Sequence, residues 1–387
     1  MKFKTQLLHS GAGAEPQTGA LTTPIYQSST FTYGNAAEGK ARFAGEHAGF
    51  IYSRMGNPTV HALEQQLAEL EGAEEALVVA SGMAAVSSIF YALVSAGDEV
   101  AFIDPVYGGT AAFLINTLTR AGIHVSSYCS DDDLLANIKA GTKLVLFEPI
   151  TNPNLKVSDY RKVIAAAEKT GAITVCDNTF LTPYLFNPLA KGIDIVMHSA
   201  TKYLSGHGDI IAGVVAGKRQ LMQSIRTIAL KHIGAPIGPQ EAYLLQRGLR
   251  TLALRMDAHL TGAAQVAEFL AKHPAVTRVI YPGLADDPGH ITLADTVGAY
   301  GGMVSIELSG GFTRAARFLD KLTLFTQAVS LGDLESLACH PASTTHAAMS
   351  ENARQQAGVT DDLIRLSIGV EAPEDLIADL AQALAFA

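Results

Sequence analysis

Ile195-Val-Met-His198-Ser199-Ala200-Thr201-Lys202-Tyr203 is the stretch that decides the fold, because an apolar strand ends there in two hydroxyl residues and a lysine. A lysine directly after a buried strand is partly desolvated, which lowers its pKa from about 10.4 and makes the amine a better nucleophile. The hydroxyls of Ser199 and Thr201 flank Lys202 and can bind a phosphate. Taken alone, the pattern also describes a lysine whose stem packs on the surface while its amine reaches water.

Short apolar runs on both sides of this stretch predict further buried strands, with helical patterns between most of them. Strands buried on both faces have continuous apolar sequences, and helical crossovers imply a mainly parallel sheet. We therefore expect an α/β fold with a mostly parallel central sheet flanked by helices. The predicted strands cover residues 76–80, 100–103, 124–128, 144–147, 173–176, 193–197 and 211–215.

The pattern divides the chain into three parts. The first part lacks sustained periodicity and predicts an extended N-terminal arm. A helix then begins cleanly, with Asn57 as its cap, Pro58 at its first position and Gly72 at its end. The last part is a smaller α+β domain with a strand at 363–370 and a terminal helix at 373–385. The expected boundaries are 1–57 for the arm, 58–248 for the cofactor-binding domain and 249–387 for the C-terminal domain.

Composition excludes several classes of protein. The net charge of −9 without a basic block argues against binding to nucleic acid. The three cysteines lie far apart, which fits a reducing compartment and argues against disulfides and a zinc or other metal site. No apolar segment of a signal peptide follows the first residues. The uncharged stretch 76–97 fits a buried strand, a turn and a buried helix better than a membrane span, so we expect a cytoplasmic protein that does not enter membranes.

Two more strand ends carry polar residues. Val79-Ala80-Ser81-Gly82-Met83 joins a strand to a helix, and the free N–H groups of such a helix start bind anions. Asp177 ends the apolar run 173–176, where a buried carboxylate needs a partner. Each feature alone also fits an ordinary turn or a structural hydrogen bond. Together with Lys202, these two strand ends supply an amine, an anion cradle and an acid. An aldehyde cofactor with a phosphate and a protonatable ring nitrogen requires these three groups.

Four longer motifs contain these residues or lie elsewhere in the chain, and together they are similar to those of a known family. The sequence resembles the Cys/Met-metabolism family of fold-type-I pyridoxal phosphate enzymes over essentially its whole length. The resemblance implies pyridoxal 5'-phosphate as cofactor, an amino acid as substrate and a homotetramer built from catalytic dimers. The motifs are Ser199-Ala-Thr-Lys202-Tyr203-Leu-Ser-Gly-His-Gly-Asp209, Tyr52-Ser-Arg54-Met-Gly-Asn-Pro58-Thr59, Val106-Tyr107-Gly-Gly-Thr110 and Glu148-Pro-Ile-Thr-Asn152-Pro153.

The resemblance also implies a role for individual residues. Lys202 would hold the cofactor and move protons, Asp177 would hold the proton on its ring nitrogen, and Tyr107 would stack on the ring and act as acid or base. Asn152 would lie near the ring oxygen. The phosphate would be bound by Gly82, Met83, Ser199 and Thr201, together with Tyr52 and Arg54 of the neighbouring subunit.

Arg365 corresponds to the arginine that grips the substrate carboxylate in this family, and the strand pattern agrees. In 363–370, Ile364, Leu366 and Ile368 share one face, so Arg365 lies on the other. The planar guanidinium binds a carboxylate bidentately. Without the resemblance, a surface arginine on an edge strand would be the better explanation of the residue.

Two positions bear on the substrate. Family members that handle cystathionine carry a motif similar to Tyr-Gly-Gly-Thr/Ser-x-Arg. Here Thr110 is followed by Ala111 and Ala112, so the arginine is missing. Cystathionine γ-lyases tend to carry glutamate before the serine that matches Ser330, and this chain has Val329. The stretch 330–346 is closest to methionine γ-lyases, although these usually have cysteine where this chain has Gly109.

These features predict γ-elimination of L-methionine and related sulfur amino acids to 2-oxobutanoate, ammonia and a thiol. Val329 and Ser330 join Arg365 as expected substrate-binding residues. The alternatives are an O-acetylhomoserine sulfhydrylase, a cystathionine γ-lyase or β-lyase of broad specificity, and a non-catalytic regulator that keeps the cofactor fold.

Overall fold

The central sheet has seven strands in the order β1-β7-β6-β5-β4-β2-β3 in the computed structural model, which describes residues 1–11, 13, 15, 17–347 and 349–386. Neighbours from β6 to β3 are parallel, and β7 runs antiparallel to both β1 and β6. The predicted fold class is therefore confirmed. The strands are β1 (Glu75–Val79), β2 (Glu99–Ile103), β3 (His124–Tyr128), β4 (Thr142–Phe147), β5 (Ile173–Asp177), β6 (Ile195–Ser199) and β7 (Gly213–Gly217).

Side chains alternate between the two faces of this sheet, and helices bury both faces. Cys176 and Val196 point into one apolar cluster, whereas Val175 and Met197 point into another on the opposite face. This double burial explains the continuous apolar runs of the strands. The helices around the sheet are α3 (Pro58–Glu71), α4 (Gly82–Leu93), α5 (Gly108–Ala112), α6 (Asp131–Asn137), α7 (Tyr160–Glu168), α8 (Thr182–Leu185), α9 (Arg219–Arg226) and α10 (Pro239–Leu249), with shorter 3-10 or π turns at Phe113–Leu118, Leu189–Lys191 and Thr227–Ile233.

Two strands begin later than predicted. The carboxylate of Asp194 accepts hydrogen bonds from the backbone N–H and the hydroxyl of Thr174, both at 2.9 Å, so β6 begins at Ile195 and not at 193. β7 begins at Gly213, because Ile211 projects largely into solvent at the rim of the cavity described below. The predicted cap of α3 is confirmed, since the side chain of Asn57 accepts the N–H of Thr59 at 2.9 Å.

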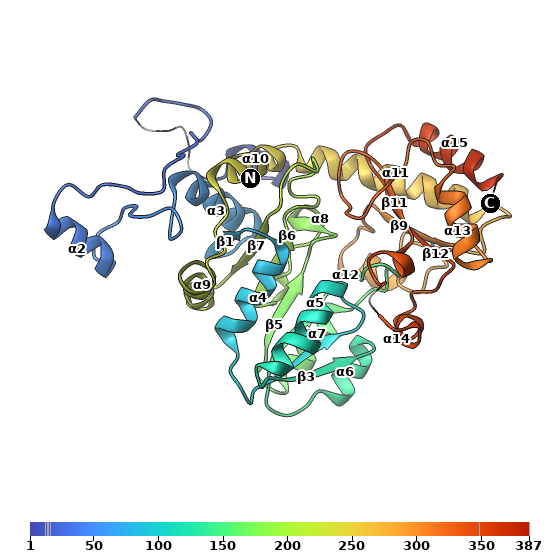
Figure 1. The fold of residues 1–387 in the computed structure, drawn as a ribbon, viewed down its shortest axis with the longest axis horizontal. Coiled ribbons are helices and arrows are strands. Elements are labelled where there is room, and N and C mark those ends of the chain that lie inside the picture. Colours follow the sequence, from blue (N-terminus) through green and yellow to red (C-terminus); the bar gives the residue numbers. More distant parts are fainter. Residues whose placement is uncertain (12, 14, 16, 348, 387) are drawn as a thin grey trace.

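The N-terminal arm is not extended throughout, as the sequence had suggested. It contains α1 (Phe3–His9) and α2 (Ala36–Ala44), which are too short to give a sustained apolar period. α1 is anchored by the buried Leu7, whose carbonyl accepts a hydrogen bond from Gln66 of α3 at 3.0 Å. The segment around α2 projects away from the rest of the chain in Figure 1.

A second sheet lies in the C-terminal part, in the order β10-β11-β12-β9-β8. Ile364, Leu366 and Ile368 pack into its core, whereas Arg365 and Ser367 lie on the opposite face, as predicted. Helix α11 leads from the region of α10 into this part (Figure 1). The elements are α11 (Leu252–Ala271), β8 (Arg278–Ile280), α12 (His290–Thr296), β9 (Met303–Glu307), α13 (Gly311–Leu319), β10 (Thr326–Gln327), β11 (Leu337–Cys339), a 3-10 turn at Pro341–Ser343, α14 (Glu351–Gln356), β12 (Leu363–Ser367) and α15 (Pro373–Leu384).

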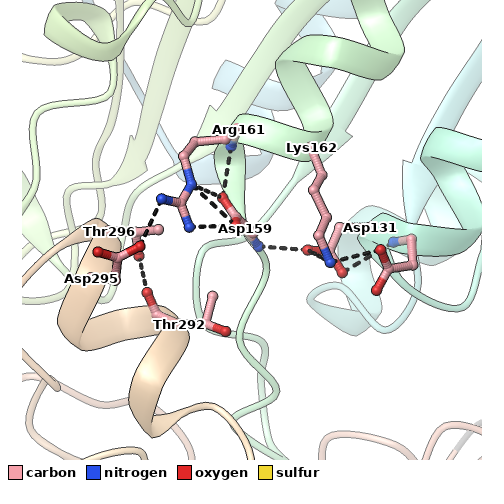
Figure 2. A network of polar contacts seen from close by, with 8 residues as sticks. Asp131, Asp159, Arg161, Lys162, Thr292, Asp295 and Thr296 are labelled. Atoms are coloured by element: carbon pink, nitrogen blue, oxygen red, sulfur yellow. Dashed lines mark hydrogen bonds and ion pairs between the residues drawn. The ribbon is translucent and has the colours of Figure 1, made fainter.

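A polar network connects α12 to the helices beside the central sheet (Figure 2). Arg161, at the start of α7, bonds to Asp159 and to Asp295 of α12, each at 2.7 Å. Lys162 pairs with Asp132 at 2.6 Å. The Arg161 side chain is half exposed, so these pairs contribute little to stability, although they connect α7 with α12.

Two further observations concern the residues that the structure describes. No helix among them is long and apolar enough to cross a membrane. No three or more of their His, Cys, Asp and Glu side chains are grouped so that they could hold a metal ion.

Candidate active site

A cavity of about 590 Å³ opens at the carboxyl ends of β4, β5 and β6, between the central sheet and the second sheet. This is the edge at which the sequence predicted a site. The cavity collects residues that are far apart in the sequence. Those among its lining that were predicted are Gly82, Met83, Tyr107, Asn152, Asp177, Ser199, Thr201, Lys202, Val329, Ser330 and Arg365.

Lys202 follows β6 and extends its amine toward the second sheet. Its Nζ atom donates a hydrogen bond to the Ser330 hydroxyl at 2.9 Å. Burial lowers the pKa of Lys202, the carboxylate of Asp333 opposes this effect, and the charge of Arg365 reinforces it. A larger share of the amine is therefore neutral near pH 7 than for a lysine in water, as a nucleophile requires. Ser330 has a φ of 96°, a rare conformation for a non-glycine residue and one that accompanies functional sites.

Helix α4 begins at the wall of the cavity next to the end of β6. The hydroxyl of its cap, Ser81, accepts the N–H of Ala84 at 3.0 Å. A Cβ atom on Gly82 would lie 2.9 Å from the Cβ of Ser199, so glycine lets the helix start approach the strand end. The first N–H groups of a helix have no partner within it. With the hydroxyls of Ser199 and Thr201, they make an anion-binding cradle.

Asp177 ends β5, one strand away from β6. Its Oδ1 atom accepts hydrogen bonds from the backbone N–H of Thr179 at 3.1 Å and from the Thr179 hydroxyl at 2.5 Å. The same hydroxyl accepts the N–H of Ser199 at 2.8 Å, so Thr179 connects the two strand ends. Burial raises the pKa of Asp177, whereas the Thr179 bonds and the nearby His198 lower it. Asp177 is a partly buried acid at the cavity wall, which suits a protonated ring nitrogen.

Arg365 enters the cavity from β12. It is 3% exposed, and its two terminal nitrogens donate to Asn152 Oδ1 at 3.0 Å and to the Ser330 carbonyl at 2.7 Å. Its Nε atom is buried and has no hydrogen-bond partner among the described residues. A buried guanidinium beside the Lys202 amine is placed to receive a carboxylate.

Thr179 and Glu148 are two polar residues of this cavity to which sequence reasoning gave no role. Thr179 had a local signal, because a threonine two residues after an aspartate often forms this turn. Glu148 follows β4, and its carboxylate accepts the backbone N–H groups of Tyr107 and Asn152 at 2.7 and 3.3 Å. Burial raises the pKa of Glu148 well above its usual range, and the charge of Asp177 adds to this effect.

Tyr52 and Arg54 do not line the cavity of their own chain. They lie at the end of the arm, where the Arg54 guanidinium is near the ring of Tyr52 and donates to the Leu230 carbonyl at 3.0 Å. The structure of one chain thus brings together all the predicted site residues except these two.

The arrangement matches one kind of cofactor. An amine with a lowered pKa, an anion cradle and a partly buried acid surround the cavity, and Gly82 keeps the cradle open where a side chain would fill it. These groups fit an aldehyde that also bears a phosphate and a basic ring nitrogen. Fold and site therefore define a pyridoxal phosphate-dependent enzyme.

Comparison with known proteins specifies the family. The model of the family described as "Cys/Met metabolism PLP-dependent enzyme" matches residues 4–385, and the chain belongs to this family. It is 46% identical to an L-methionine γ-lyase of Pseudomonas putida, over 99% of this chain and 97% of that protein. It is 44% identical to a cystathionine β-lyase of Lactococcus lactis, over 99% of this chain and 98% of that one.

Solved structures agree with the fold. A putative O-acetylhomoserine (thiol)-lyase from Campylobacter jejuni has a TM-score of 0.95 at 36% identity and covers 100% of both chains. That structure contains a pyridoxyl-lysine phosphate. A cystathionine γ-lyase from Lactobacillus plantarum, in complex with L-serine, has a TM-score of 0.93 at 40% identity, covering 100% of this chain and 99% of that one.

Gly109 offers a test of how closely the Tyr107 ring is held. A Cβ atom at Gly109 would lie 2.6 Å from Cε1 of Tyr107, so Gly109→Ala must displace the ring. We expect kcat to fall roughly 10-fold, since small misplacements of a reacting group have effects of this order. Gly108→Ala is the matched control, because its Cβ would only meet the Thr345 carbonyl at 3.5 Å. Equal kcat values for the two variants in steady-state assays would contradict this description of the ring.

Proposed function

We propose that the protein catalyses γ-elimination of L-methionine and related sulfur amino acids. Methionine and water would give methanethiol, ammonia and 2-oxobutanoate. One observation carries the proposal: the charged side chains that line the cavity in the described part of the chain are Glu148, Asp177, Lys202 and Arg365. Arg365 would bind one carboxylate, and no second basic side chain besides Lys202 is among the described lining residues, which include the apolar Val329. The similarity to methionine γ-lyases supports the same substrate.

The residues around the cofactor would divide the work. Bound pyridoxal phosphate supplies an electron sink that stabilises negative charge next to the substrate nitrogen. Asp177 would keep the proton on the ring nitrogen, and Asn152 would lie near the ring oxygen. Gly82, Met83, Ser199 and Thr201 hold the phosphate through their N–H and hydroxyl groups.

Proton transfer falls to two side chains. Lys202, which also binds the cofactor, takes the proton from Cα and then one from Cβ of the substrate, for which a partly neutral amine is required. Tyr107 would stack on the ring when the cofactor is bound, and would donate a proton to the sulfur as the bond to Cγ breaks. Arg365 binds the substrate carboxylate, and Ser330 holds both Lys202 and Arg365 through the two bonds described above.

We further propose that the enzyme is a cytoplasmic homotetramer built from catalytic dimers. The position of Tyr52 and Arg54 supports the catalytic dimer, because both residues are exposed and neither lines the cavity of its own chain. In the dimer they would complete the phosphate site of the neighbouring subunit.

A shared site predicts complementation between inactive variants. Arg54→Ala and Lys202→Ala chains should each be inactive or nearly so alone, because each lacks one part of every site. In a mixed dimer one site would contain both an intact Lys202 and an intact Arg54, so activity should return to about a quarter of the wild-type value in a random mixture of dimers. Subunit exchange is verified by mass spectrometry. Exchanged subunits without activity would contradict the shared site.

The cavity also predicts a preference among substrates. Cystathionine carries a second ammonium and carboxylate, and a charge-assisted hydrogen bond to such a group recovers about 1.5–3 kcal/mol. Because the partners are missing, kcat/KM should favour methionine over cystathionine by about 10–100-fold. Val329→Glu should narrow this preference, whereas the uncharged Val329→Gln should leave it largely unchanged. Equal kcat/KM values for methionine and cystathionine in the wild type would favour a lyase of broad specificity.

A further inference from the structure

Glu148 lies in the cavity and has no part in the reaction proposed above. It follows β4 directly, and its side chain is 6% exposed. Its Oε1 atom accepts the backbone N–H of Tyr107 at 2.7 Å, and its Oε2 atom accepts that of Asn152 at 3.3 Å. Burying a carboxylate without hydrogen-bond partners costs several kcal/mol of folding free energy, and these two bonds supply the partners. What remains to be explained is why a carboxyl group lies at this position at all.

The two turns that Glu148 joins come from different parts of the fold. Tyr107 starts α5 after β2, whereas Asn152 lies in the turn that follows β4. The side chain of Asn152 continues the connection, because its Oδ1 accepts a hydrogen bond from Arg365 of β12 at 3.0 Å. One chain of bonds therefore runs from Tyr107 through Glu148 and Asn152 to Arg365.

The two hydrogen bonds use both oxygens of the Glu148 carboxyl group. Each carboxylate oxygen accepts one N–H group, whereas glutamine has a single oxygen and would turn its NH2 group toward the other N–H. The carboxylate of aspartate is shorter by one methylene and cannot reach both turns in the same place. Glu64 provides a comparison, since it is equally buried at 6%, accepts the N–H of Val78 at 3.2 Å and pairs with Arg226, but lies outside the cavity.

We propose that Glu148 is a positioning residue that fixes the distance between Tyr107, which acts at the sulfur, and the Asn152–Arg365 pair, which binds the carboxylate. This inference rests on the proposed function, since the residues at the two ends of the series of hydrogen bonds, Tyr107 and Arg365, both act on the proposed substrate. Without Glu148 the Tyr107 turn would move relative to a substrate whose carboxylate Arg365 still binds and whose Cα proton Lys202 still reaches. Departure of the thiol would then slow much more than removal of the Cα proton.

The test separates these two steps in the cofactor-loaded enzyme. For Glu148→Gln we expect thiol release from methionine to fall roughly 100-fold and KM to rise several-fold, because a misplaced reacting group loses about this much. Exchange of the Cα proton of L-alanine, which has no leaving group, should change less than about 3-fold in deuterated water at saturation. The visible absorption band and the cofactor content should match the wild type. Glu64→Gln should leave the ratio of elimination to exchange unchanged.

Three outcomes would overturn the inference. These are an unchanged ratio of elimination to exchange in Glu148→Gln, an equal change in Glu64→Gln, or parallel loss of both rates together with cofactor content, which indicates a structural role only. If Glu148→Gln does not fold, Glu148→Asp is measured in the same way. In that variant too, elimination should fall more than exchange of the Cα proton, by a smaller factor than in Glu148→Gln. Failure of the wild type to release methanethiol would instead contradict the proposed function. The ratio of elimination to exchange would then be measured with the sulfur amino acid that is turned over.

Discussion

Replacing Lys202 with alanine is expected to lower kcat/KM by roughly 10⁴-fold or more, because one amine both binds the cofactor and transfers protons. In the structure its Nζ lies 2.9 Å from the Ser330 hydroxyl, and burial lowers its pKa. The wild-type protein should be yellow, and borohydride should attach the cofactor covalently to the peptide that contains Lys202. Lys191, which is exposed on a turn outside the cavity, provides the control Lys191→Ala with wild-type activity. A modified peptide without Lys202, or an active Lys202→Ala variant, would contradict the assignment.

The second large effect concerns Asp177. Asp177→Ala should reduce kcat/KM by at least about 10²-fold, since a charge-assisted hydrogen bond is worth up to about 3 kcal/mol and a neutral ring is a poor electron sink. Its hydrogen bonds to the backbone N–H and the hydroxyl of Thr179 hold the carboxyl at the end of β5. The variant should still bind the cofactor, because Lys202 and the phosphate cradle remain.

Asp104 is the matched control for this variant. It also follows a strand at the same edge of the sheet and is partly buried, but it does not line the cavity. Asp104→Asn should therefore retain most of the activity, with cofactor content measured alongside kcat/KM in both variants. Similar losses in the two variants would show that the effect of Asp177 is one of folding and not of chemistry.

The central sheet and most of the site could be predicted because their signals are local. Lys202, Asp177 and Gly82 each stand directly at the end of a strand or the start of a helix, so a parallel sheet brings them to one edge. Arg365 could be placed from the alternation along its strand. The two helices of the arm were not predicted, because seven and nine residues are too few to show a clear helical period of apolar residues.

Contacts between distant parts of the chain could not be predicted. Ser330 bonds to Lys202 across a separation of 128 residues, and Glu148 acts on the backbone of Tyr107, which leaves no trace in the side-chain pattern. The roles of Tyr52 and Arg54 require a second chain and stay predictions. The domain boundaries after residues 57 and 248 stay predictions as well.

Analysis of the products formed from each substrate tests the proposed elimination most directly. The purified enzyme is incubated with L-methionine, and methanethiol, ammonia and 2-oxobutanoate are quantified; O-acetyl-L-homoserine with sulfide is tested in parallel. We predict that the three products appear in equal amounts from methionine, at a kcat/KM that exceeds the one for replacement on O-acetylhomoserine. Formation of homocysteine from O-acetylhomoserine and sulfide, without methanethiol from methionine, would contradict the proposal and identify a sulfhydrylase.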